Sequence, residues 1–300
     1  MSATVGVIGL GAMGSAIAIR LCQAGFDVIG IDLLDRNMSE LESHGGRRAA
    51  TPRAMAEEAN FIITSLPSAD AFHEVTTGQS GIAAASRAGI VVIDTCTLAV
   101  DDKAEAARRL DDIDITLLDC TVSGSRATCL AGDLATFASG DKDAFDRSAD
   151  VFAAFANPLH WMGDFGNASR IKYVLNYLVC IHNAASAEAL AYATKMGLDP
   201  HQVYDLVNTS VARSRIWELR AKMMVDGDYK TSRGTYNISR KDAKIIGAIA
   251  QEIEAPAPVF NAALQMHYAA MAQGYSGMDT ASLYEVYKRA AGLDDIVEPE

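Results

Sequence analysis

Residues 4–32 read TVGVIGLGAMGSAIAIRLCQAGFDVIGID, and this stretch decides the fold. Thr4–Ile8 is a short run with several β-branched residues, which is typical of a buried strand. A helical, alanine- and isoleucine-rich segment follows and ends at Gly25, and Val28–Ile31 is a second apolar run. The order strand, glycine-rich turn, helix, strand predicts the opening βαβ unit of a parallel sheet.

Three glycines occupy the turn between the first strand and the first helix. Gly9, Gly11 and Gly14 form a GxGxxG pattern. The first glycine permits a tight turn, the second lets a pyrophosphate approach the backbone, and the third lets helix and strand pack closely. The N–H groups and partial positive charge of the helix N-terminus favour phosphate. We therefore expect a dinucleotide to bind the loop formed by Gly9, Leu10, Gly11, Ala12, Met13 and Gly14.

An acidic residue follows the second strand and indicates which dinucleotide binds. Asp32 can accept hydrogen bonds from the ribose hydroxyls of adenosine and would repel a 2′-phosphate, so the sequence favours NAD over NADP. Arg36 is close enough in sequence to reach a phosphate, but Leu33 and Leu34 supply no cation directly after Asp32. Strand, helix and acid together disfavour the alternative of a glycine-rich turn without a ligand.

Strand and helix signals alternate up to about residue 165, and the remaining chain reads as helices only. We predict a Rossmann domain over residues 1–165, an all-helical domain over residues 166–300, and a long central helix ending at Lys195 that joins them. The segment 69–85 is less regular, and the acidic segment 141–155 is predicted as one helix. Further strands are predicted at 61–65, 89–94, 115–119, 134–139 and 158–162.

Composition narrows the range of partners and compartments. The formal net charge is −12 and no cluster of lysine and arginine offsets it, so nucleic acid and anionic membranes are not expected partners. The five cysteines are scattered without a CxxC pair, which indicates reduced thiols in a cytoplasmic protein and no zinc site. We expect no bound metal, because the six histidines are equally dispersed.

The segment GDFGNASRIKYVLN, Gly163–Asn176, stands where the chain becomes helical. A helix that opens here would face the cleft between the two predicted domains. Lys172 and Asn176 are four residues apart, which places them on one face of that helix, one turn apart. Taken alone, a solvated lysine beside a surface asparagine is the commoner arrangement.

Four separated motifs, in order, resemble the β-hydroxyacid dehydrogenases, the family of 3-hydroxyisobutyrate dehydrogenase and tartronate semialdehyde reductase. They cover nearly the whole chain, which is far more specific than any single motif. The motifs are GLGAMG at Gly9–Gly14, DCTVSGS at Asp119–Ser125, the segment Gly163–Asn176, and Lys241–Asp242 with the later GYSGMDTAS at Gly274–Ser282.

The resemblance implies a role for each matching residue. Lys172 is the implied general acid–base, and Asn176 orients the substrate or the lysine. The turn Ser123, Gly124 and Ser125 is implied to bind the substrate carboxylate. Leu66, Pro67 and Thr97 are implied to line the NAD site, and Lys241 to approach both cofactor and substrate. The family departures are Thr121 where proline is usual, Ser125 for a second glycine, Leu175 for an asparagine, and arginines at Arg126 and Arg170.

The expected reaction is NAD-dependent oxidation of a small β-hydroxy acid, or reduction of the matching semialdehyde. Lys172 would take the hydroxyl proton while hydride leaves the same carbon, and we hypothesise that burial beside NAD⁺ lowers the pKa of this lysine. The segment Ser214–Tyr229 resembles dehydrogenases of four-carbon sugar acids such as threonate. The resemblance offers Trp217 and Arg220 as pocket residues, whereas the residue types favour the alternative of a buried tryptophan and a surface arginine.

Two other functions remain open at this point. One is oxidative decarboxylation, as in the related 6-phosphogluconate dehydrogenases, although no clear phosphate clamp is present. The other is a non-catalytic NAD-binding sensor, which Lys172 and Asn176 disfavour. An imine reductase of similar fold is disfavoured because the lysine is retained. The alanine- and methionine-rich helical domain predicts a homodimer or homotetramer.

Overall fold

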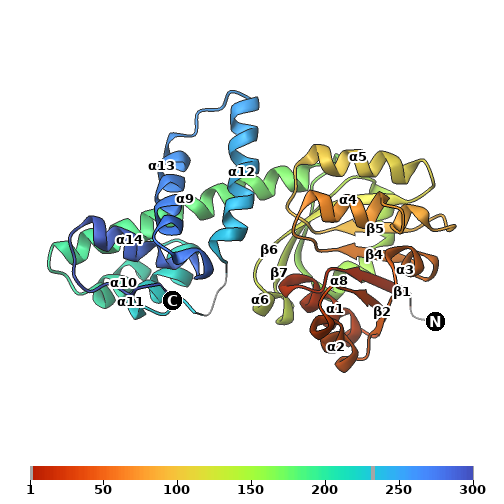
Figure 1. Cartoon of the computed structure of the whole chain (residues 1–300), viewed down its shortest axis with the longest axis horizontal. Coiled ribbons are helices and arrows are strands. Elements are labelled where there is room, and N and C mark those ends of the chain that lie inside the picture. Colours follow the sequence, from red (N-terminus) through yellow and green to blue (C-terminus); the bar gives the residue numbers. More distant parts are fainter. Residues whose placement is uncertain (1–2, 231–233, 300) are drawn as a thin grey trace. The chain divides into compact units, whose positions relative to one another are not determined.

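The computed structural model describes residues 3–230 and 234–299. The chain divides into two compact units, Met1–Lys172 and Tyr173–Glu300. The division falls inside helix α9 (Asn167–Lys195), which is the predicted central helix. The first unit is a helix-flanked sheet and the described part of the second is built from helices, which confirms the predicted fold class (Figure 1). The domain limits 1–165 and 166–300 stay a prediction.

The first unit contains an eight-stranded sheet with the order β3-β2-β1-β4-β5-β6-β7-β8. The first six strands in this order, from β3 through β1 to β6, run parallel to one another, and β7 pairs antiparallel with β6. The carboxyl ends of the parallel strands therefore meet at one edge, where such sheets bind ligands. The strands are β1 (Thr4–Ile8), β2 (Asp27–Ile31), β3 (Arg47–Arg48), β4 (Phe61–Thr64), β5 (Val91–Asp94), β6 (Thr116–Ser123), β7 (Leu134–Ser139) and β8 (Ala156–Trp161).

Helices cover both faces of this sheet, and each face has its own apolar core. The apolar segment that ends in β5 is buried on both sides, because Val91 and Ile93 belong to one core and Val92 to the other. Figure 1 shows α4 and α5 on one side of the sheet and α1 and α8 on the other. Helices α1 (Ala12–Gln23), α2 (Asp35–Ser43), α6 (Arg126–Leu130), α7 (Lys142–Arg147) and α8 (Ala149–Phe155) contribute to the first core. Helices α3 (Pro52–Glu58), α4 (Ala69–Thr77) and α5 (Val100–Asp111) contribute to the second.

Two local predictions in this unit were wrong, and one segment described as less regular contains a helix. The irregular segment 69–85 begins with helix α4, whose N-cap Ser68 accepts a hydrogen bond from the Ala71 N–H. The acidic segment 141–155 is two helices, α7 and α8, divided at Ser148. Strand β6 continues past the predicted end at Asp119 to Ser123, because its last residues pair with β7.

The second unit packs helices around a core of large side chains that includes Trp217, Tyr229, Tyr236 and Tyr275. A π-helical turn, Trp217–Ala221, precedes α11. Of the helices in the described part of the chain, none combines the length and apolar character that crossing a bilayer requires. Besides the later part of α9, the unit contains α10 (Pro200–Asn208), α11 (Lys222–Asp226), α12 (Tyr236–Glu252), α13 (Pro258–Ala272) and α14 (Leu283–Ala290).

Candidate functional site

The glycine loop after β1 has two positions that the fold reserves for glycine and one that it does not. Gly9 has a φ of +87°, and a Cβ on it would lie 2.3 Å from the Ser65 carbonyl oxygen. A Cβ on Gly14 would lie 1.9 Å from the Gly9 carbonyl oxygen. Nothing lies within 4 Å of the Cβ position of Gly11, which is the N-cap of α1. The loop therefore keeps open space at a helix N-terminus, as a pyrophosphate site requires.

Asp32 holds the glycine loop from the end of β2. One oxygen of its carboxylate accepts a hydrogen bond from the Leu10 N–H at 2.7 Å, and the other accepts from the Leu34 N–H at 2.8 Å. A carboxylate oxygen can accept more than one hydrogen bond, so Asp32 can still bind ribose hydroxyls. Arg48 on the neighbouring β3 is engaged by Asp35 and by Glu42, at 2.8 Å from the latter. A carboxylate at Asp32 that can accept further hydrogen bonds, with the arginine of the neighbouring strand already paired with two carboxylates, fits NAD, which has no 2′-phosphate to bind.

The other expected NAD-site residues follow the two adjacent strands. Leu66 and Pro67 come after β4, and Thr97 comes after β5, which pairs with β4 in parallel. The Leu66 N–H donates to Cys96 Sγ at 3.0 Å, which ties the two loops together. The structure therefore brings these residues to the same sheet edge as the glycine loop and Asp32.

The expected carboxylate-binding turn, Ser123–Ser125, has a different structure from the one predicted. Ser123 is the last residue of β6 and pairs with Ala135 of β7. Ser125 is the N-cap of α6: its hydroxyl accepts from the Thr128 N–H, and its own N–H donates to Thr128 Oγ1 at 2.8 Å. A Cβ on Gly124 would lie 2.5 Å from that same Oγ1. The Ser125 N–H is thus already engaged by the Thr128 side chain, and carboxylate binding by this turn stays a prediction.

Arg126 and Arg170 depart from the family pattern, and Trp217 and Arg220 were considered as pocket residues. All four side chains contact other residues of the chain. Arg126 pairs with Glu40 at 2.7 Å. Arg170 is exposed and donates to Asn167 Oδ1. Arg220, expected at the surface unless it lined a pocket, is buried and lies 3.4 Å from Asp279. Trp217 is buried and stacks on Tyr204.

A buried ionic network lies beneath the start of α9, and no sequence motif indicated it. Lys103 of α5 is fully buried, and its Nζ lies 2.8 Å from Asp94 and 2.7 Å from Asp119. Burial opposes the charge on this lysine, but the two carboxylates raise the pKa of Lys103 above its ordinary value. Burial likewise opposes ionisation of Asp119, yet Lys103 and Ser169 hold the pKa of Asp119 below its ordinary value. A lysine in a polar helical segment reads as solvated, so only the tertiary structure reveals this network.

In the second unit, a hydrogen bond joins two of the expected substrate-site elements. Asn176 Nδ2 on α9 donates to Asp242 Oδ2 on α12 at 2.7 Å. Asp242 is buried, and its other oxygen lies 3.5 Å from Lys241 Nζ. The structure thus places Asn176 and Lys241 around one carboxylate, a partner that the sequence reasoning did not assign. Lys172 lies four residues before Asn176 on α9 and is half-buried.

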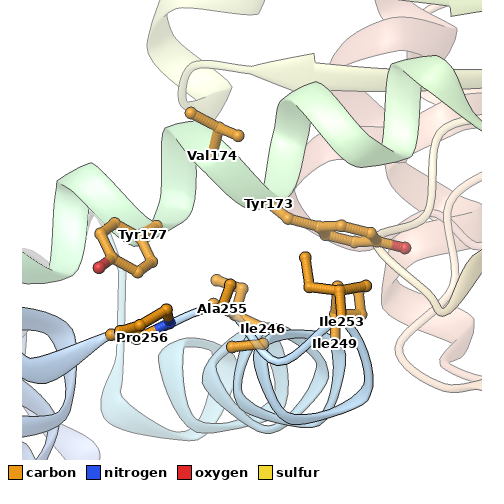
Figure 2. Close-up of a pocket in the computed structure, with 10 residues that line it drawn as sticks. Tyr173, Val174, Tyr177, Ile246, Ile249, Ile253, Ala255 and Pro256 are labelled. Atoms are coloured by element: carbon orange, nitrogen blue, oxygen red, sulfur yellow. The ribbon is translucent and has the colours of Figure 1, made fainter.

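A cavity of about 360 Å³ lies in the second unit between α9 and α12. Figure 2 shows Tyr173 and Tyr177 of α9 facing Ile246 and Ile249 of α12 across it. Val174, Ala250, Ile253 and the loop residues Ala255, Pro256 and Ala257 also line the cavity. The lining is almost entirely apolar, so this cavity does not match a polyhydroxylated, anionic substrate.

Two protein-family models match the chain in succession. The model described as the NAD binding domain of 6-phosphogluconate dehydrogenase matches residues 4–163. The model described as NAD-binding of NADP-dependent 3-hydroxyisobutyrate dehydrogenase matches residues 166–287.

Individual proteins match over nearly their whole length. An L-threonate dehydrogenase of Cupriavidus necator is 32% identical over 288 residues, covering 96% of this chain and 97% of its own. An L-threonate dehydrogenase of Escherichia coli K12 is 30% identical and covers 94% of each chain. The crystal structure of a 3-hydroxyisobutyrate dehydrogenase from Salmonella typhimurium superposes with a TM-score of 0.87 at 30% identity, covering 95% of this chain and 100% of its own.

The fold and these matches define an NAD-binding oxidoreductase that acts on a CH–OH group. The chain belongs to the β-hydroxyacid dehydrogenase family. Its substrate class is accordingly a small hydroxy acid.

Proposed function

We propose that this protein oxidises a four-carbon sugar acid of the threonate type with NAD⁺, using Lys172 as the acid–base group. The observation that carries the proposal is the side-chain arrangement on α9. Lys172 precedes Asn176 by one helical turn, and Asn176 is held at 2.7 Å by Asp242, whose neighbour Lys241 supplies a second cation. The threonate dehydrogenases among the relatives support the substrate class.

Each residue of the proposed site would have its own role in binding or catalysis. The glycine loop and Asp32 would hold the dinucleotide, with Leu66, Pro67 and Thr97 beside it. NAD⁺, when bound, supplies the hydride acceptor. Lys172 in its neutral form would take the hydroxyl proton of the substrate, and in the reverse direction its ammonium form would return that proton. Asn176 would orient the hydroxyl by a hydrogen bond. Ser123, Gly124 and Lys241 would bind the carboxylate.

The experiment that tests the function is NAD⁺ reduction, followed by NADH absorbance, with both threonate enantiomers, glycerate, 3-hydroxyisobutyrate and serine. NADP⁺ is run in parallel. We expect the highest kcat/KM with one threonate and NAD⁺. A higher kcat/KM for 3-hydroxyisobutyrate or serine would contradict the sugar-acid assignment. Released CO₂ would instead indicate oxidative decarboxylation, and NADH binding without turnover on any acid would indicate a sensor.

We also infer that the protein is cytoplasmic and forms homodimers or homotetramers through its helical unit. The supporting observation for assembly is a group of large apolar side chains exposed on α9 and α13. Val174 is 53% exposed, Leu178 is 42% exposed and Val259 is 60% exposed. A second copy of the chain is the occupant to which this inference commits.

A further inference from the structure

Three buried side chains of the sheet form hydrogen bonds with the first turn of α9. Asp119 on β6 accepts two hydrogen bonds from Ser169, from the main-chain N–H at 2.8 Å and from the hydroxyl at 2.7 Å. Thr121, two residues along the same strand, donates its hydroxyl to the Ala168 carbonyl oxygen at 2.6 Å. Ser139 on β7 accepts from the Ala168 N–H at 3.1 Å. All three side chains have no exposed surface.

These contacts fix both the position and the rotation of the helix. The Ala168 and Ser169 N–H groups belong to the opening turn of α9, where N–H groups lack partners inside the helix, and the sheet supplies acceptors for them. The negative charge of Asp119 is also favourable beside a helix N-terminus. Because Lys103 anchors Asp119 at 2.7 Å, the acceptor itself cannot turn freely.

Lys172 lies on the side of the helix that these hydrogen bonds hold in place. It follows Ala168 by four residues and Ser169 by three, and residues at these spacings are neighbours on one helical face. A rotation or shift of the first turn would therefore move the Lys172 side chain directly. An acid–base group must lie within hydrogen-bond reach of the proton it transfers, so its rate depends on that placement.

We propose that Thr121 and Ser169, acting with Asp119, are positioning residues that set the place of Lys172 for proton transfer. The inference rests on the proposed role of Lys172. The Thr121 hydroxyl donates from β6 to the Ala168 carbonyl oxygen, so this contact with α9 depends on a side chain of that strand. In this chain that strand therefore contributes to the placement of the lysine as well as to the substrate turn.

The test uses hydroxyl deletions with matched controls. Thr121→Val is compared with Thr136→Val, since Thr136 is equally buried on the neighbouring β7 and donates to Leu134 of its own strand. Ser169→Ala is compared with Ser186→Ala, since Ser186 is buried on the same helix and donates to His182. Each variant is assayed for kcat, KM for the acid, NADH affinity, unfolding temperature and the pH profile of kcat/KM. Ser169→Thr is included because it keeps the hydroxyl.

We expect Ser169→Ala to lower kcat by about 10- to 100-fold and Thr121→Val by about 5-fold, because small displacements of catalytic groups cost rate steeply. NADH affinity should stay within about twofold of the wild-type value, and the pH profile of kcat/KM should shift. A loss of stability alone would not produce this combination. Ser169→Thr should recover most of kcat. If the test variants match their controls while Lys172→Ala is inactive, the positioning role is overturned. If Lys172→Ala itself keeps turnover, the proposed function fails first.

Discussion

Ser169 donates to Asp119 through both its main-chain N–H and its hydroxyl, at 2.8 and 2.7 Å, so one residue of α9 is bound twice to one residue of β6. Backbone and side chain together fix the direction in which the helix leaves the sheet. The carboxylate is in turn held by Lys103. The lysine proposed for catalysis therefore extends from a helix whose first turn is part of the core of the first unit.

Replacing Lys172 should separate chemistry from cofactor binding. Lys172→Ala should lower kcat by roughly 10²–10⁴-fold, because the general acid–base group is lost, while the Kd for NADH changes little. Steady-state kinetics and NADH fluorescence titration measure the two quantities. Lys195→Ala is the control, since Lys195 is exposed at the far end of the same helix. Turnover at more than a tenth of the wild-type rate would be inconsistent with the assignment.

Two glycines of the nucleotide loop should fail in different ways. A Cβ at Gly14 would lie 1.9 Å from a carbonyl oxygen, so Gly14→Ala should destabilise the protein by about 3 kcal/mol or more. Gly11 has no neighbour within 4 Å of its Cβ position, so Gly11→Ala should fold normally. It should still raise the Kd for NADH by about tenfold, equivalent to about 1.4 kcal/mol. Thermal unfolding and NADH titration distinguish the two, and an unchanged Kd for Gly11→Ala would argue against phosphate binding there.

The Asn176–Asp242 hydrogen bond should matter for the acid substrate and not for NAD. Asn176→Ala removes a donor 2.7 Å from a buried carboxylate. We expect kcat/KM for the acid to fall by about 10- to 100-fold, and the KM for NAD⁺ to change less than about twofold. Asn208→Ala is a suitable control on α10 of the same unit. Equal losses for both substrates would indicate that Asn176 supports the fold only.

Acidification should destabilise the protein through one histidine of α13. Burial and the nearby charge of Arg220 lower the pKa of His267 to about 4. The unfolded chain binds this proton near pH 6.5 and the folded chain does not, so stability falls as the pH is lowered from 6.5 toward 4. The loss from this group is at most about 3 kcal/mol. It is measured by urea unfolding across that pH range.

His267→Asn should reduce that pH-dependent loss, because the variant has no group that titrates in the range. The exposed His201 provides the control, and His201→Asn should leave the slope as in the wild type. The comparison of slopes is needed because the unfolded chain also begins to protonate carboxylates such as Asp119 at the acid end of the range, while the folded protein holds the pKa of Asp119 below its ordinary value. Parallel slopes for wild type and His267→Asn would show that the histidine is protonated in the folded protein.

The exposed apolar side chains of the helical unit lead to a prediction about assembly. Light scattering after gel filtration should give the mass of a dimer or tetramer, and Leu178→Asp should lower that mass by placing a charge one helical turn from the exposed Val174. Val211→Asp is the control, because Val211 is fully exposed in the loop after α10. A monomeric wild type at micromolar concentration would refute the inference.

The sequence predicted the parts of the fold that depend on local pattern. The glycine loop, the apolar strands and the long helix each carry a short-range signal, and β1 and β7 begin and end at the predicted residues. It missed helix α6, because a five-residue helix depends on the Ser125–Thr128 capping box more than on hydrophobic periodicity. It also ended β6 too early, since pairing with β7 is a long-range interaction.

In the candidate site, too, short-range patterns could be predicted from the sequence and long-range contacts could not. Residues within one motif, such as Lys172 and Asn176, could be placed on one face from spacing alone. Asp242 as the partner of Asn176 required the packing of α12 on α9, and the charge partners of Lys103 lie on two different strands. No sequence window contains such groups together. The motifs contained Asp119, Ser169 and Asp242, but the role of these residues in holding others became apparent only from the tertiary structure.

The two hydrogen bonds to Asp32 have a practical consequence for coenzyme engineering. An attempt to convert the protein to NADP⁺ would ordinarily begin by removing this carboxylate, which repels a 2′-phosphate. Here the same group holds the Leu10 and Leu34 amides, so its removal would also loosen the phosphate-binding loop. Leu33, whose side chain is fully exposed, is the better starting point. A basic residue there adds a phosphate ligand and leaves the loop intact.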